Sequence, residues 1–221
     1  MSHSLRAAFD REFGEICSDL VSASQLVDAA IERSMQALLE RDVELARQVI
    51  ANDEKVNALR FKIEEACLVL IATQQPAAGD LRAVITAIHI VVEIERMGDH
   101  AAGIAKTVIL MEDEPLLKTF KKIPRMGELS RKMLADCLQA FLRRDAAWAR
   151  QIADQDEKMD ELYRAVFDRL VGIMAKKPEL VTRATYLMWC AHNLERIADR
   201  VTNIAERIIF MMTGTMQELN V

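Results

Sequence analysis

The sequence of 221 residues predicts an all-α protein made of two repeated three-helix units. Three observations indicate this fold class. Glycine and proline are scarce, at seven and four residues, so few positions interrupt regular structure. Apolar side chains recur seven positions apart over long stretches, which is typical of helices that pack lengthwise. Segments of the first half also return about a hundred residues later.

The repeat is as long as a domain. The segment ERMGDHAAGIA at 95–105 returns as ERIADRVTNIA at 195–205, an offset of 100 positions. The segment ARQVIANDEKVNAL at 46–59 returns as ARQIADQDEKMDEL at 149–162, with seven of fourteen positions identical at an offset of 103. A repeat of this length indicates a duplicated domain rather than a short solenoid unit.

Turn residues divide the chain into six predicted helices. In order, these helices span 5–40, 43–74, 79–112, 125–143, 145–176 and 179–213. The breaks fall at Arg41-Asp42, Pro76 to Gly79, Arg144-Asp145 and Lys177-Pro178. The segment Glu112–Pro124 holds two prolines and mixed charges, and we expect it to join a first unit at 1–115 to a second at 116–221.

Heptad spacing supports the longest helices. The last helix carries the series Leu187, Leu194, Val201 and Ile208, with Cys190, Ile197, Ile204 and Met211 beside it. The third helix repeats this 100 residues earlier with Ala87, Ile94, Ala101, Val108, Ile90, Met97, Ile104 and Met111. The second and fifth helices carry Val49, Val56, Ile63 and Leu70, and Ile152, Met159, Val166 and Ile173. Residues 25–39 and 129–142 show a less regular heptad spacing of apolar residues. We expect these positions to form the core.

Charge and motifs exclude several classes of function. A net charge of −5 without a basic block argues against a nucleic-acid partner. The sequence contains no phosphate-binding loop, dinucleotide fingerprint or nucleophile elbow, so it does not predict an enzyme. No signal-peptide core and no membrane-length apolar stretch occurs, and we expect a cytoplasmic protein. The four cysteines form no CxxC pair and are predicted to be reduced.

Oxygen-bearing side chains four positions apart are the main candidates for function. On the third helix the pair is Glu95 with Asp99, and on the last helix it is Glu195 with Asp199, which Asn203 extends by one turn. On the second and fifth helices the pairs are Asp53 with Asn57 and Asp156 with Asp160. The heptad positions named above form an apolar seam along each helix. All of these oxygen-bearing residues lie off the seams, and each pair shares one face of its helix.

Two interpretations of these acids remain open. A solvated helix surface is the ordinary explanation of such a pair. Like charges at this spacing disfavour a helix by about 0.2–0.5 kcal/mol per pair, however, and a bound cation would reverse that sign. Carboxylate and amide oxygens suit hard cations such as Mg²⁺, Mn²⁺, Ca²⁺ or iron. The duplication of the arrangement weakens the surface explanation and leaves a metal site as an equal alternative. His192 could assist such a site, although a histidine at this position is more often a surface residue.

Taken together, these segments resemble the PhoU family of phosphate-uptake regulators. The resemblance rests on ERMGDHA, ERIADRVTNI, DEKVNAL, DEKMDEL and QQPAAGDLR, whose order and spacing follow the family over nearly the whole chain. It implies two three-helix bundles related by pseudo-twofold symmetry, with metal clusters of iron, Mn or Mg held through an E(D)xxxD motif. That motif corresponds to Glu95 with Asp99 and Glu195 with Asp199. The co-ligands would be Asp53, Asn57, Asp156 and Asp160. Asn203 is added because it follows Asp199 by one helical turn.

The resemblance also implies a regulator rather than an enzyme. Members of the family restrain phosphate uptake and phosphate-starvation gene expression when phosphate is plentiful. They are thought to contact the ATPase subunit of the phosphate ABC transporter and a membrane sensor histidine kinase, and they often form homodimers. Association with a membrane would then occur only through these partners. The alternative is a metal store or metalloenzyme built on a helical bundle, for which the sequence offers no clear acid or base.

The two copies also depart from each other. The differing pairs are Gly98 and Ala198, Asn57 and Asp160, and Gly103 and Asn203. Because the first copy has fewer oxygen ligands, we expect its site to bind metal more weakly or with a different number of ions than the second.

Overall fold

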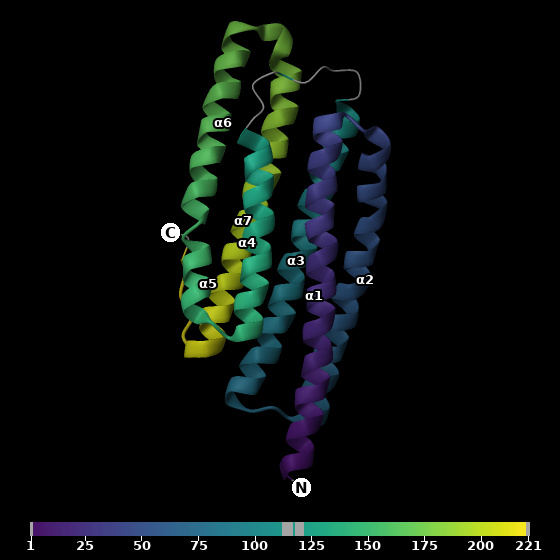
Figure 1. Ribbon diagram of the computed structural model, residues 1–221, viewed down its shortest axis with the longest axis vertical. Helices are drawn as coiled ribbons and strands as arrows, with labels where there is room; N and C mark the ends of the chain where they lie inside the picture. Colours follow the sequence, from purple (N-terminus) through teal and green to yellow (C-terminus); the bar gives the residue numbers. More distant parts are fainter. Residues whose placement is uncertain (1, 112–116, 118–121, 220–221) are drawn as a thin grey trace.

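The computed structural model describes residues 2–111, 117 and 122–219, and within them it contains helices and no strands (Figure 1). The elements are α1 (Ser2–Glu40), α2 (Val43–Gln74), α3 (Ala78–Leu110), α4 (Lys122–Arg143), α5 (Ala146–Ala153), α6 (Asp156–Lys176), the 3₁₀ turn η1 (Pro178–Leu180) and α7 (Val181–Thr213). Most of the predicted joint Glu112–Pro124 lies outside the described residues. Among the described helices, none is long and apolar enough to cross a membrane.

Each half is a three-helix bundle, as predicted. In the first half α1, α2 and α3 pack on one another, and in the second half α4, the pair α5 and α6, and α7 do the same (Figure 1). The halves meet where α3 lies along α7 and α1 lies along α4. Because each of these contacts joins equivalent helices of the repeat, the arrangement is that of two similar bundles across an approximate twofold axis. The predicted all-α fold class is confirmed.

The predicted seams form the core. Every seam position on α2, α3 and α7 is buried, including Ala87, Ile94, Ile197 and Ile204. On the fifth predicted helix the first three seam positions are buried and Ile173 is half-buried. Cys67, Cys137 and Cys190 are buried, Cys17 is partly buried, and none of the four forms a disulfide. The heptad register therefore places the acids on the flanks of the bundles, as expected.

Matching turns begin the second helix of each half. Arg41 and Arg144 adopt the left-handed conformation, with φ of 60° and 54°. The next residue then caps a helix, since the Asp42 carboxylate accepts a hydrogen bond from the backbone N–H of Leu45 at 2.8 Å. Asp145 accepts the equivalent bond from Trp148 at 2.9 Å. An aspartate at this position satisfies a backbone N–H that the helix itself leaves unpaired.

The single predicted helix at 145–176 is wrong, because the structure divides it into α5 and α6. Asp154 and Gln155 form a turn between them, whereas α2 of the first half runs unbroken through Ala51 and Asn52, their equivalents. Alanine is the best helix former, and aspartate competes for local backbone hydrogen bonds. At the break Asp154 replaces Ala51, which lowers the local helix propensity of the second copy.

Equivalent residues of α1 and α4 meet across the halves. Arg131 donates from Nε to Oδ1 of Asp28 at 2.8 Å and from Nη2 to Oδ2 at 2.9 Å. Its Nη1 also donates to Glu32 at 2.6 Å. Asp28 and Arg131 are 103 positions apart, which is the offset of the repeat. The same position therefore carries opposite charges in the two halves, and the charges pair.

Two equivalent contacts, related by the repeat, form where α3 packs on α7. His100 Nδ1 lies 3.0 Å from Asn193 Oδ1 in a hydrogen bond. Offset by 100 positions, Arg200 Nη1 lies 3.5 Å from Glu93 Oε2. A β-carbon at Gly103 would come within 2.9 Å of Asn193 Oδ1, so glycine allows this close approach of the two helices. The repeat thus forms a polar contact at the same place between α3 and α7 twice, each time with different side chains.

Candidate metal centre

In the second half the predicted acids line one groove beside α5, α6 and α7. Asp156 and Asp160 come from α6, and Glu195 and Asp199 come from α7. The groove has a volume of about 850 Å³ and is open to solvent. Its full lining is Arg150, Ala153, Asp154, Asp156, Glu157, Asp160, Glu195, Asp199 and Leu219. The structure therefore brings together all four carboxylates predicted for this half.

The break between α5 and α6 positions two of the groove's acids. It places Asp156 and Glu157 in the first turn of α6, and Asp160 follows one turn later. The backbone N–H groups at a helix N-terminus favour nearby negative charge, by about 0.3–1 kcal/mol per group. On α7 the i,i+4 spacing directs Glu195 and Asp199 to the same side. Local helix structure thus holds four like charges along one groove.

The charges of the groove destabilise one another. Burial, followed by the neighbouring charges of Asp199, Asp160 and Glu195, raises the pKa of Asp156 to about 6. Burial and then the Asp199 charge raise the pKa of Glu195. Burial also raises the pKa of Asp199, against the opposing effect of Arg196. Each shift has the sign expected of carboxylates that lack sufficient positive charge.

Two carboxylate oxygens of the groove are buried without a hydrogen-bond partner, namely Asp156 Oδ1 and Glu195 Oε2. The imidazole of His192 lies nearby, with its Nδ1 3.3 Å from Glu195 Oε2. Asp199 is partly neutralised, since Arg196 Nη1 lies 2.6 Å from its Oδ2. An unsatisfied buried acceptor costs about 1–3 kcal/mol, and more when it is charged. Oxygens of this kind are the ligands that hard cations prefer.

The groove is not a closed cage. Among the described residues, no three carboxylate, imidazole or thiol groups converge tightly enough to hold a metal ion. The acids instead line the sides of an open groove. A bound cation would therefore draw the side chains inward from their present positions.

In the first half the equivalent acids also lie near one another. Burial, then the charges of Asp99 and Glu95, raises the pKa of Asp53, while Lys106 lowers it. Glu95 is not unpaired, because Arg60 Nη1 donates a 2.9 Å hydrogen bond to its Oε1. Positive charge from the protein therefore reaches this cluster from both helices.

Gly98 allows Asp53 to lie close to α3. A β-carbon at Gly98 would come within 2.9 Å of Asp53 Oδ1. The equivalent residue on α7 is Ala198, which carries that β-carbon. Asn57, half-buried, follows Asp53 one turn later on α2.

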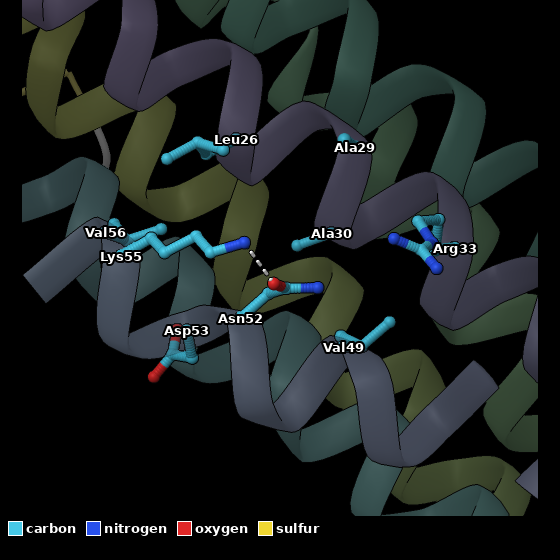
Figure 2. Close-up of a pocket in the computed structure, with 9 residues that line it drawn as sticks. All are labelled: Leu26, Ala29, Ala30, Arg33, Val49, Asn52, Asp53, Lys55 and Val56. Atoms are coloured by element: carbon cyan, nitrogen blue, oxygen red, sulfur yellow. Dashed lines mark hydrogen bonds between the residues drawn. The ribbon is translucent and has the colours of Figure 1, made fainter. Parts of the chain in front are cut away.

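A small pocket beside Asp53 contains none of the other predicted acids of the first half. It has a volume of about 160 Å³, lies between α1 and α2, and is lined by Leu26, Ala29, Ala30, Arg33, Val49, Asn52, Asp53, Lys55 and Val56. Figure 2 shows the Asp53 carboxylate pointing away from the α1 residues of this pocket, while Lys55 reaches Asn52. That contact is a 2.6 Å hydrogen bond from Lys55 Nζ to Asn52 Oδ1. The pocket is mainly apolar and contains no second carboxylate.

Asn203 lies away from the groove. Its Nδ2 is 3.4 Å from Glu93 Oε2, at the interface between α7 and α3. It is not among the residues that line the groove. The two arginines that follow the paired glutamates form ion pairs on their own helices, Arg96 with Glu93 at 3.6 Å and Arg196 with Asp199 at 2.6 Å.

Sequence reasoning missed several side chains of both sites. Arg60 pairs with Glu95, and at an offset of 103 its equivalent is Tyr163, whose pKa is raised by burial and by the charge of Glu195. The repeat alignment contained this difference, because Arg60 and Tyr163 each directly follow the aligned segments. Asp154, Glu157 and Arg150 also line the groove. Of these, Asp154 had a signal, since it replaces Ala51.

Known proteins of one family match the chain over almost its whole length. The PhoU domain family matches residues 20–108 and 123–208. The chain is 36% identical over 216 residues to the phosphate-specific transport system accessory protein PhoU homolog of Streptococcus pneumoniae, covering 98% of this chain and 100% of the relative. A Caulobacter vibrioides protein with the same description is 36% identical over 208 residues, covering 94% of this chain and 90% of the relative.

Solved structures agree with the sequence matches. The crystal structure of the phosphate transport system regulatory protein PhoU from Streptococcus pneumoniae superposes with a TM-score of 0.90 at 36% identity, covering 96% of this chain and 100% of that one. PhoU from Pseudomonas aeruginosa gives 0.89 at 33% identity, covering 94% and 100%. With both repeats matched in sequence and in fold, the chain belongs to the PhoU family.

Proposed function

We propose that this chain is an accessory protein of phosphate transport that restrains phosphate uptake and phosphate-starvation signalling when phosphate is plentiful. Family membership over nearly the full length supports this role, since the relatives are described as phosphate-specific transport system accessory proteins. The partners in this proposal are the ATPase subunit of the phosphate ABC transporter and a membrane sensor histidine kinase. The protein acts in the cytoplasm, as a homodimer, and reaches the membrane only through these partners.

Metal binding is part of the proposal. The observation that carries it is the second-half groove, where two buried carboxylate oxygens lack partners. Asp156, Asp160, Glu195 and Asp199 would hold a hard cation there, and Asp53, Glu95 and Asp99 are their counterparts in the first half. A bound cation would supply positive charge that fixes α6 against α7. Asn57 remains a candidate co-ligand by its position on α2, and Asn203 would have to leave Glu93 to contribute.

The protein acts by contact rather than by turnover in this proposal. The groove is lined by carboxylates in mutual repulsion and by Arg150, while Arg196 pairs with Asp199 and Arg164 lies 3.8 Å from Asp160. A metalloenzyme or a metal store is the competing function. Turnover of phosphate esters by the Mn²⁺-loaded chain would favour the enzyme, and release of many ions per chain would favour the store.

Deletion tests the regulatory role. Removing all copies of the family from the host is expected to leave phosphate-starvation genes expressed in rich phosphate, and the wild-type chain restores repression. Transcript levels and phosphate uptake rates give the measurement. Normal uptake and normal repression after complete deletion would contradict the proposal.

Recovery of partners tests the mechanism. A tagged chain from phosphate-replete cells is expected to retain the transporter ATPase subunit or the sensor kinase.

A double variant tests the metal binding. Asp99→Ala/Asp199→Ala keeps the seams intact and is expected to lose tight metal binding by elemental analysis. A double variant that retains metal like the parent would show that the site is assigned to the wrong residues.

A further inference from the structure

The pocket between α1 and α2 is apolar inside and carries two cations at its rim. Its apolar lining is Leu26, Ala29, Ala30, Val49 and Val56. Figure 2 shows the Lys55 ammonium and the Arg33 guanidinium on either side of Ala30. The carboxylate of the lining, which belongs to Asp53, points away from the α1 residues. The pocket therefore presents an apolar surface next to two positive charges.

The two rim cations bind only uncharged groups of the protein. Lys55 Nζ donates a hydrogen bond to Asn52 Oδ1 at 2.6 Å, and Arg33 Nη2 donates one to Gln48 Oε1 at 2.7 Å. Both acceptors are side-chain amides. Within the part of the chain that the structure describes, neither cation forms an ion pair with a carboxylate. Both charges are therefore available to carboxylates of another molecule, which would accept charge-assisted hydrogen bonds from them.

The second half fills the equivalent space. Three apolar residues of the pocket have larger equivalents 103 positions later, and all three equivalents are fully buried. The pairs are Ala30 and Met133, Val49 and Ile152, and Val56 and Met159. The rim differs as well, because Arg33 corresponds to Asp136. Since both halves have the same fold, small residues and an arginine at these positions are not a requirement of that fold.

The size of the pocket indicates what it can hold. Its volume of about 160 Å³ is close to the roughly 150 Å³ of an apolar cavity that accepts benzene. Sites for small-molecule ligands usually measure about 300–1,000 Å³. The pocket is thus the size of one leucine or phenylalanine side chain, and a single anchored side chain of this kind often dominates a protein–protein contact. The size and the charged rim together favour an acidic protein segment over a metabolite.

We propose that the pocket between α1 and α2 is a docking site for an acidic segment of a partner protein. The segment inserts one leucine- or phenylalanine-sized side chain over Ala30 and Val49, and its flanking carboxylates pair with Arg33 and Lys55. This inference adds a contact surface to the proposed function and rests on its use of protein partners. Because the second half fills the equivalent space, each chain offers this docking site once.

NMR titration of the ¹⁵N-labelled full chain tests the docking site with a blocked peptide, Glu-Glu-Leu-Glu-Glu. We expect saturable shifts of the backbone amides of Ala29, Ala30 and Val49. A peptide with alanine in place of the leucine should bind at least tenfold more weakly, because it lacks the anchor. A peptide with lysines in place of the glutamates should cause no shift at the pocket. Added salt should weaken binding, since the rim is exposed to solvent.

Two variants copy the second half into the pocket. Ala30→Met introduces the residue found at Met133 and should lower the affinity for the leucine peptide at least tenfold by filling the pocket. Arg33→Asp introduces the charge found at Asp136 and should lower it at least fivefold. Arg47→Asp is the matched control, because it makes the same charge change on an α2 side chain that is 60% exposed and outside the pocket. It should change the affinity less than twofold.

Folding of the variants is checked by circular dichroism. If Ala30→Met lowers helicity, Arg33→Asp with its control carries the test. The absence of shifts at the pocket with the leucine peptide would overturn the docking site, and so would equal binding of the leucine and alanine peptides. Equal losses from Arg33→Asp and Arg47→Asp would overturn it too, because they would show attraction to net charge alone.

These results are distinguishable from a failure of the proposed function. A docking site that fails in the titration leaves the regulatory role in place, since deletion and partner recovery test that role separately. Normal repression after complete deletion would contradict the regulatory role, whereas the titration would still show whether the pocket accepts an acidic segment.

Discussion

The first and second halves of the molecule agree in their cores and differ on the faces that carry acids. Seam positions 100 residues apart, such as Met97 and Ile197, are both fully buried. On the outer faces Arg60 becomes Tyr163 and Asn57 becomes Asp160. A buried position is constrained by packing on every side, whereas a flank position is constrained only by what it binds. The halves have therefore kept one fold while their sites have diverged.

The largest expected effect tests whether the two cores are equivalent. Met97→Ala and Ile197→Ala should each lower the free energy of unfolding by about 2–5 kcal/mol, because each removes buried methylene groups and leaves a cavity. Chemical denaturation gives the measurement, with Glu161→Ala on the exposed surface of α6 as a control that should change little. An unchanged midpoint for either core variant would mean that the register of that half is misassigned.

The pH dependence of the metal-free protein tests the difference in the acidic faces. Asp156 has a pKa of about 6 in the fold against an ordinary value of 3.8, so between these values the folded chain binds more protons than the unfolded chain. Its contribution to stability therefore falls as pH rises from about 4 to 6.

Variants that remove a carboxylate with a raised pKa should gain stability at pH values above that pKa. Asp156→Asn should be more stable than the wild type at pH 7 in chelator, and this advantage should shrink toward pH 4. Asp53→Asn should show the same trend, since the pKa of Asp53 is also raised. Denaturation midpoints between pH 4 and 7 provide the measurement. A gain for Asp156→Asn that grows toward low pH would contradict the assignment.

A smaller effect tests the cause of the break between α5 and α6. Helix propensities of ordinary residues differ from that of alanine by up to about 0.7 kcal/mol. Asp154→Ala should therefore raise the free energy of unfolding by about 0.5 kcal/mol, and Ala51→Asp should lower it by a similar amount. Denaturation of both variants measures the change. If Asp154→Ala is instead destabilising, the break has a packing cause and not a local one.

The effect of Gly98→Ala, which copies Ala198 into the first half, is the sum of two opposing contributions. Alanine favours a helix over glycine by about 1 kcal/mol. The new β-carbon would also displace the Asp53 carboxylate, whose Oδ1 lies 2.9 Å from its position. Because the end of a flexible side chain can move, we expect a net change within about 1 kcal/mol. The pKa of Asp53 should shift toward its ordinary value as the carboxylate moves outward, which NMR titration would detect. An unshifted pKa would contradict this movement.

Much of the fold could be predicted because the seams run along whole helices. Ala87 to Met111 and Leu187 to Met211 repeat one pattern, and packing leaves little freedom to such a pattern. The break at Asp154 could not be seen in this way, since Ile152 and Met159 keep their spacing across it. Periodicity records which residues are buried, and it is insensitive to one exposed turn.

The site was predictable only where spacing alone places a side chain. Glu195 and Asp199 share the groove because they are one turn apart. Asn203 continues the same ladder, but it lies about 12 Å along the helix from Glu195, which takes it beyond the groove. There α3 crosses α7, and Asn203 meets Glu93. The role of Arg60 required knowledge of which side chain crosses between two helices, and no spacing along one helix contains that information.

The contact of Asp28 with Arg131 makes the two halves electrostatically complementary to each other. Two first halves brought together in the same way would place Asp28 against Asp28, and two second halves would place Arg131 against Arg131. Only the mixed pairing satisfies both. The single chain therefore behaves as a heterodimer whose two subunits are tethered, and its halves select each other over copies of themselves. This preference acts against the pairing of identical halves from neighbouring chains, which similar repeats would otherwise permit.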